Sequence, residues 1–391
     1  MTDGSIETST AAMKADHRHY IGLDLLRLFA AFLVVFNHFG IFSAARPDVG
    51  APFAFPALNF ASDFGWVGVE IFFVISGFVI PLTASGATAG AFVKRRVIRV
   101  FPALWICTFL GFAVLVASGQ PAQELLLPLL HSLILSPKGP YIDGVVWTLV
   151  VEAVFYALIW AALMSGTIER IGRIGAGLGL VSAIFLIFYG FTKLFSHDPA
   201  IGELSSALDR FTFRVLLLRH GVFFALGLLI WAGHTSGYSR VQRLLIAVMA
   251  IFGVLEISFQ YWSTATVPSV QAMAIPILLW AASVAILMAS IRFAKQLSDR
   301  FRDHRNLLVK LGLLTYPLYL NHYTLGRVMT FSLVSHGVPS WLSFVAVMAT
   351  ILLSSWCIMI FAEPALQSVL RKRLPVSRVA NGGTAEAAPR S

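Results

Sequence analysis

The sequence predicts an all-α fold, a polytopic membrane bundle of about ten transmembrane helices. Hydrophobic residues make up 58% of the 391 residues, charged residues only 12%, and the mean hydropathy is +0.80. A soluble domain does not need that much apolar surface. Apolar segments long enough to cross a hydrocarbon core roughly 30 Å thick recur along the chain. They lie near residues 22–42, 66–84, 99–118, 146–165, 174–192, 213–233, 243–262, 270–291, 312–334 and 341–361.

Basic residues are concentrated in alternate loops. One set of loops and the tail carry Lys94, Arg95, Arg96, Arg99, Arg170, Arg173, Arg240, Arg243, Arg292, Lys295, Arg300, Arg302, Arg305, Lys310, Arg371, Lys372, Arg373 and Arg378. The other loops hold only Arg46, Lys138, Lys193 and Arg210. The positive-inside rule therefore predicts that the first set and both termini are cytoplasmic. It also accounts for the net charge of +10 without any nucleic-acid partner.

The chain is predicted to form one membrane domain, residues 19–371. The flanking residues 1–18 and 372–391 are polar or rich in Pro, Gly and Ala, and we expect them to be disordered cytoplasmic segments. No repeat relates the two halves, which disfavours an inverted-repeat transporter. The longest outer loops, 43–65 and 119–144, are either caps over the mouth of a cavity or simple connectors.

Arg27 and His38 lie eleven residues apart on the first apolar segment. At about 100° and 1.5 Å per residue, they share nearly one face and stand roughly 16 Å apart. Ionisable residues on a membrane helix usually face the bundle interior or a wet cavity. The alternative is that Arg27 reaches the interface while His38 bonds to a neighbouring helix. Since histidine exchanges protons near neutral pH, His38 is the candidate general base.

A basic cluster stands at the start of the third apolar segment, where four cations fall within residues 94–99. Arg95 and Arg99 are four residues apart and Arg96 and Arg99 three apart, so they share a helix face. Guanidinium groups on one face are suited to bidentate phosphate binding. The alternative is a stop-transfer signal that anchors the helix among lipid headgroups.

Other polar residues interrupt the apolar segments and are candidates for an acceptor site or a cavity lining. They are Glu70, Ser76, Trp147, Tyr156, Tyr319 and His322. Glu152 could orient a histidine on another helix, or it could form a structural ion pair with an arginine such as Arg219. For Glu363, near the cytoplasmic end of the last segment, we expect a capping or salt-bridge role.

The order of these segments resembles acyltransferase family 3, integral-membrane O-acyltransferases that modify sugars of lipopolysaccharide, exopolysaccharide and nodulation factors, or macrolides. The resemblance covers residues 20–365. It rests on residues 22–27 (GLDLLR) with His38, 72–78 (FFVISGF), 95–102 (RRVIRVFP), 147–156 (WTLVVEAVFY) and 316–322 (YPLYLNH). All five motifs in this order are specific for the family. Thr148 and Thr315 stand where the family usually has Ser.

The resemblance implies transfer of an acyl group, commonly acetyl, from cytoplasmic acyl-CoA to a hydroxyl of a saccharide, a lipid-linked glycan or a macrolide-like acceptor. It implies a multi-pass protein of the cell (inner) membrane with acyl-CoA as co-substrate and neither a cofactor nor a metal. In this chemistry His38 is the base and Glu152 holds its tautomer. Arg27, Arg95, Arg96 and Arg99 bind the donor phosphates, and the acceptor arrives from the outer face. A transporter or flippase of an acylated or sugar substrate is the alternative.

Overall fold

The computed structural model describes residues 20–44, 63–265 and 267–374, and within these ranges all regular structure is helical. The bundle begins with α2 (Ile21–Ala44), α4 (Val67–Ala84), α5 (Ala89–Ala117), α6 (Ala122–Leu133), α7 (Val146–Met164), α8 (Ile171–Leu194), α9 (Pro199–Leu208) and α10 (Phe211–Val215). It continues with α11 (Gly221–Ser236), α12 (Arg240–Thr264), α13 (Val270–Arg292), α14 (Ala294–Arg300), α15 (Arg305–Ser335), α16 (Ser340–Cys357) and α17 (Glu363–Arg373). The all-α prediction is confirmed.

The prediction of about ten spanning helices is not confirmed. Eight helical segments of the described chain are long and apolar enough to cross a membrane: α2, α4, α5, α7, α8, α12, α13, and the segment from α16 through α17. The other two predicted segments are helical but do not qualify. α11 has only 16 residues, and α15 carries polar residues such as Asn321, His322 and Arg327 in its middle.

α11 is short because it is enclosed by protein rather than by lipid. Nearly every residue from Gly221 to Gly233 is buried, and the helix packs between α4 and α8. A Cβ added at Gly77 or Gly227 would collide with the backbone of the facing helix, so α4 and α11 approach at a distance that only glycine permits. α11 starts later than the predicted segment 213–233, because α10 and Leu217, whose backbone is left-handed with φ 60°, come before it.

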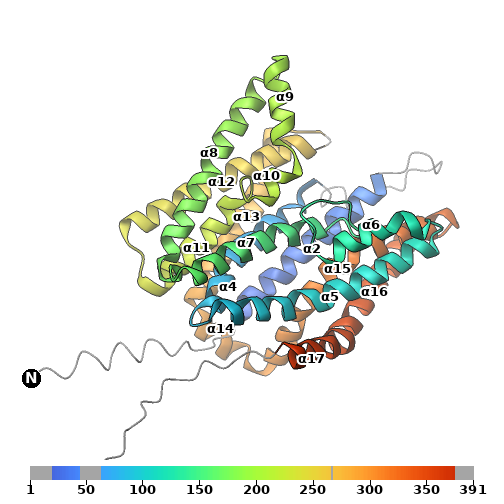
Figure 1. Ribbon diagram of the computed structural model, residues 1–391. Helices are drawn as coiled ribbons and strands as arrows, with labels where there is room; N and C mark the ends of the chain where they lie inside the picture. The colour runs from blue at the N-terminus through green and yellow to red at the C-terminus, as the bar shows by residue number, and fades with distance from the viewer. Residues whose placement is uncertain (1–19, 45–62, 266, 375–391) are drawn as a thin grey trace, which may run out of the picture.

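The site is enclosed by five helices. α2 packs along α15 on one side and against α4 on the other, while α5 contacts α15 and α7. Figure 1 shows these helices side by side in one half of the bundle, with α8 and α9 projecting from the other half. Gly312 allows the close approach of α15 to α2, since a Cβ there would meet the carboxyl group of Asp24.

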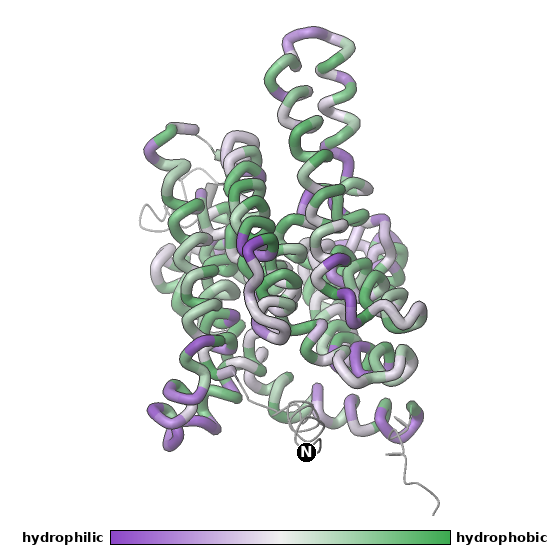
Figure 2. The backbone as a smooth tube through the Cα atoms, turned by 90° about the vertical axis from the view of Figure 1, so that its left-hand side faces the viewer, coloured by the Kyte–Doolittle hydropathy of each residue, from purple (hydrophilic) through white to green (hydrophobic). Residues whose placement is uncertain are grey.

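Hydrophilic residues gather at the turns and at the two ends of the bundle, and hydrophobic residues cover the helices between them (Figure 2). We call the end that holds residues 94–99, α14, the start of α15 and α17 the basic end. α17 follows a π-helical turn, Ile358–Ala362, and packs against α5. It runs to Arg373, two residues beyond the expected end of the membrane domain.

The two long loops predicted on the outer side differ in how much of them the structure describes. Loop 119–144 is not a plain connector, because it contains α6, which packs on α5. Most of loop 43–65 lies outside the described residues, as do the terminal segments 1–18 and 375–391.

Candidate active site

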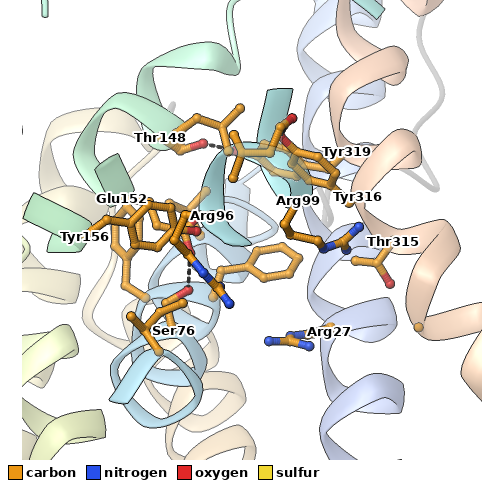
Figure 3. A pocket seen from close by; sticks show the side chains of 17 residues that line it. Arg27, Ser76, Arg96, Arg99, Thr148, Glu152, Tyr156, Thr315, Tyr316 and Tyr319 are labelled. Atoms are coloured by element: carbon orange, nitrogen blue, oxygen red, sulfur yellow. Dashed lines mark hydrogen bonds between the residues drawn. The ribbon is translucent and has the colours of Figure 1, made fainter. Parts of the chain in front are cut away.

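A cavity of about 160 Å³ lies between α2, α4, α5, α7 and α15. Its wall is apolar at positions such as Val69, Phe72, Phe73 and Leu149. Its polar lining residues, all labelled in Figure 3, are Arg27, Ser76, Arg96, Arg99, Thr148, Glu152, Tyr156, Thr315, Tyr316 and Tyr319. An apolar enclosure with a few convergent polar groups is the usual form of a small-molecule site.

Three guanidinium groups converge on this cavity from two helices (Figure 3). Arg27 of α2 lies 3.8 Å from Asp24, one helical turn away. Arg96 stands over the ring of Tyr156, 5.7 Å from its centroid. Arg99 stands over Tyr316 at 5.1 Å. Among the lining residues three arginines face one carboxylate, so the cavity favours an anionic ligand.

That carboxylate, Glu152, is bonded within the cavity. The Ser76 hydroxyl donates a hydrogen bond of 2.6 Å to Glu152 Oε1. The alternative of an ion pair between Glu152 and Arg219 is wrong, because Arg219 Nε donates to Glu256 at 2.5 Å in another part of the bundle. The expectation that Glu152 orients His38 is also corrected, since a different residue contacts that ring.

The partner of His38 is His322 of α15. His38 Nδ1 and His322 Nε2 lie 2.9 Å apart. His322 Nδ1 lies 2.8 Å from the carbonyl oxygen of Tyr319 and 3.2 Å from that of Leu318. Because a carbonyl can only accept, His322 Nδ1 carries the proton and its Nε2 accepts when the ring is neutral. His38 Nδ1 is then the donor, and the lone pair of His38 stays on Nε2.

A short segment before α7 fixes α15 next to this histidine pair. Asp143 Oδ2 accepts a hydrogen bond of 3.0 Å from the backbone N–H of Thr324, and the Thr324 hydroxyl donates to the carbonyl of Ile142 at 3.0 Å. Burial raises the pKa of the Asp143 carboxyl to about 6, while the backbone N–H groups of Val145 and Thr324, which donate to its two oxygens, oppose that rise. The turn of α15 that follows His322 is thereby tied to α7.

Tyr319 separates the cavity from the histidine pair. Its hydroxyl lies 2.9 Å from Thr148 Oγ1; the Thr148 hydroxyl already donates to Val145, so Tyr319 is the donor. Its ring meets Phe72 edge-on, with centroids 5.7 Å apart, and lies 5.8 Å from the ring of His322. His38 is partly exposed and His322 is buried. Neither lines the cavity; His322 packs on Tyr319, and His38 lies on the other side of His322 from this contact in the chain of ring contacts.

The structure brings together most of the predicted site residues. Those that line the cavity are Arg27, Arg96, Arg99, Glu152, Ser76, Tyr156 and Tyr319. Arg95 faces a second cavity at the basic end instead. Glu70 and Trp147 are elsewhere: Glu70 Oε2 lies 3.4 Å from His220 Nδ1, and the ring of Trp147 packs 5.7 Å from that of His220.

Some residues of the site were not foreseen in their roles. Thr148 and Thr315 were noted only as replacements for Ser, and Tyr316 only as part of a motif, yet all three line the cavity. Their signal is a hydroxyl within an apolar segment, which needs a partner. The salt-bridge expectation for Glu363 is confirmed, because Arg99 Nη1 lies 2.9 Å from Glu363 Oε1.

Comparison with known proteins defines the class. A family model described as an acyltransferase domain matches residues 20–360. The chain therefore belongs to acyltransferase family 3, a family of membrane acyltransferases. Nodulation protein 10 of Rhizobium leguminosarum bv. viciae is 32% identical over 162 residues, which cover 35% of this chain and 42% of that protein. The chain thus matches less than half the length of this relative. No solved structure matches.

Proposed function

We propose that the protein transfers an acyl group, commonly acetyl, from acyl-CoA to a hydroxyl of a saccharide or another glycosylated acceptor. The observation that carries this proposal is one juxtaposition. Tyr319 lines a cavity with three arginines, and its ring packs on that of His322. His322 in turn contacts His38, whose hydrogen bond through Nδ1 leaves Nε2 to take a proton.

His38 is the general base of the proposed reaction. The acceptor oxygen attacks the thioester carbonyl as its proton moves to His38 Nε2. The new C–O bond forms, the C–S bond breaks, and the proton on Nε2 passes to the departing thiolate. His322 accepts the Nδ1–H of His38 throughout, so it stabilises the imidazolium that forms in between. The Tyr319 carbonyl holds His322 in the tautomer that this requires.

The donor occupies the three-arginine cavity. Coenzyme A carries phosphates, and Arg27, Arg96 and Arg99 present charged donors suited to them. The positive-inside rule places the basic end in the cytoplasm, where acyl-CoA is made. His38 lies roughly 16 Å further along α2 than Arg27 by the helical rise. For the acyl group to reach it, the Tyr319 and Phe72 side chains have to move aside.

The acceptor arrives from the end opposite the basic end, so the acyl group crosses the membrane within the bundle while coenzyme A stays on its own side. Phosphates are too costly to carry through a bilayer, whereas a short acyl arm in a cavity is not. A transporter or flippase is less well supported, because it does not need a histidine with an oriented free lone pair.

The test uses proteoliposomes with the protein in one orientation, labelled acetyl-CoA on the side of the basic end and membrane-impermeant oligosaccharides on the other. We expect label on the oligosaccharides and release of the coenzyme A thiol. Proteoliposomes with His38→Gln are the matched control and should give neither. Product that forms only when both substrates share the side of the basic end would make this an inner-face acyltransferase. Movement of the substrate without cleavage of the thioester would favour transport.

A further inference from the structure

A second cavity of about 390 Å³ lies at the basic end, between α5 and α17. Its polar lining comes from Arg95 and Arg99 of α5 and from Glu363, Gln367 and Arg371 of α17. Figure 1 shows α17 next to α5 at this end, and the two helices are in contact. A cavity with a polar lining therefore lies at the basic end of the bundle.

Four of the five polar residues of this cavity form one chain of contacts. Arg99 Nη1 lies 2.9 Å from Glu363 Oε1. Gln367 Nε2 donates to the same oxygen at 2.9 Å, and Arg371 Nη2 donates to Gln367 Oε1 at 3.4 Å. Glu363 is buried, whereas Arg95 and Arg371 are exposed. Three guanidinium groups and one carboxylate line the cavity, which leaves its lining with an excess of positive charge.

Arg99 joins this cavity to the three-arginine cavity, because it lines both. Its guanidinium is half-buried, with Tyr316 under it on one side and Glu363 on the other. A ligand with several phosphates at one end and a long neutral arm at the other could therefore place phosphates in both cavities, on either side of Arg99, and extend its arm toward Tyr319.

We propose that the cavity between α5 and α17 binds phosphates of the nucleotide end of the acyl donor, with Arg95, Arg99 and Arg371 as their ligands. This rests on the proposed function. Glu363 competes with the bound phosphate for Arg99, because a carboxylate and a phosphate seek the same donors and repel each other. The carboxylate thus weakens phosphate binding, which favours release of free coenzyme A after transfer. Arg371 is a new member of the set of phosphate-binding residues, and it lies outside residues 20–360, the region that the family model matches.

The same chemistry would suit the phosphate of an anionic lipid headgroup, and the experiment separates the two sources. The probe is adenosine 3′,5′-bisphosphate, which carries phosphates but no arm, and its binding is measured by calorimetry on the full chain in nanodiscs of zwitterionic lipid. We expect Arg371→Gln to weaken binding by about threefold to tenfold, since a charge-assisted hydrogen bond is worth that much or more. Arg373→Gln is the matched control, because Arg373 is exposed on the same helix and lines neither cavity.

Glu363→Gln gives a result of the opposite sign. The glutamine side chain would keep the shape of the glutamate but lose the charge that competes for Arg99, so binding of the bisphosphate should tighten by a similar factor. A merely structural role for α17 predicts that both Arg371→Gln and Glu363→Gln weaken binding or leave it unchanged. Melting temperatures of all three variants show whether the helix is still docked.

Three results would overturn the proposal. They are no binding of the bisphosphate to the unaltered protein, equal binding by the Arg371→Gln and Arg373→Gln variants, or loss of the bisphosphate when anionic lipid is added to the nanodisc with no change in donor KM for Arg371→Gln. The last result would assign the cavity to lipid headgroups. If the bisphosphate binds through Arg371 but acyl-CoA is never consumed, the proposed function fails and the phosphate site remains.

Discussion

Two groups of buried charge stand in different halves of the bundle, and they are built in opposite ways. In the half formed by α8, α11 and α12, the guanidinium of Arg219 is almost fully paired. Its Nε meets Glu256 at 2.5 Å, Nη1 meets Asp209 at 3.4 Å, and Nη2 meets Gln260 at 3.0 Å. Its side chain is only 2% exposed, and it lines neither of the two cavities described above.

In the half formed by α2, α4, α5, α7 and α15, the arginines line open space. Arg96 and Arg99 lie over aromatic rings, and the carboxylate of the cavity lining, Glu152, is bonded to Ser76. Arg27 and Arg99 each have one carboxylate partner, Asp24 and Glu363, and both arginines still line the cavity. The difference shows that a buried charge marks a site only when its partners leave donors and space for a ligand. A fully paired charge such as that of Arg219 stabilises the fold, whereas charges that line a cavity are available to bind a ligand.

The largest effect is expected on stability, from the paired group. Glu256→Leu leaves the Arg219 guanidinium buried without its main partner, and removal of one member of a buried pair costs about 3–5 kcal/mol. The double variant Arg219→Leu/Glu256→Leu removes both charges and should recover much of that loss. Thermal unfolding in detergent checks both. If the double variant is as unstable as the single one, the pair is not the cause.

The second effect is on catalysis. His38→Gln keeps a hydrogen-bonding side chain but cannot take a proton, so kcat should fall by about 100-fold or more, as expected for a lost general base. Stability should change little, in contrast to Glu256→Leu. Acyl-CoA consumption measures the rate. His336→Gln, at the exposed end of α15, is the matched control and should retain full activity. Turnover near that of the control would remove His38 from the base role.

In the proposed reaction His322 is a positioning residue, so its variants should have a smaller effect that depends on whether the new side chain can accept a hydrogen bond. A glutamine at this position can still accept the Nδ1–H of His38, whereas a leucine cannot. We expect kcat to fall by about tenfold for His322→Leu and by less for His322→Gln, with the KM for the donor unchanged in both. A purely structural role predicts equal losses for the two variants, or a change in donor KM.

The sequence predicts the helical bundle and many of the residues that line the three-arginine cavity. The motif spacing places Arg27, Arg96 and Arg99 on faces that do converge, because helical periodicity fixes the direction of each side chain. Glu152 and Tyr156, one turn apart, likewise both reach the cavity.

Contacts between distant segments could not be predicted in the same way. The pairing of His38 with His322 joins residues 284 positions apart. The sequence of neither segment indicates whether Glu152 or His322 contacts the imidazole of His38. Glu70 and Trp147 lie in the right motifs but are turned toward His220 of the α10–α11 turn. The short α11 was assigned the wrong start, since a helix enclosed by protein has no need for a full membrane length.

The smallest effect tests the open half of the comparison directly. Arg96→Gln removes a guanidinium that lines the cavity. Arg219 pairs with Glu256, whereas none of the ion pairs found among the described residues includes Arg96. The fold should therefore tolerate the change. The KM for acyl-CoA should rise by about threefold to tenfold with kcat nearly unchanged, because this charge contacts the donor equally in the ground state and the transition state. The difference from the unaltered protein should shrink at high salt, where the attraction is already screened.

Lys94→Gln, which removes a cation from the same helix end but not from either cavity, is the control. If both variants leave donor KM unchanged and lower only the yield of inserted protein, the cluster is a membrane anchor, and the open charges of this half would serve the fold as the paired ones do.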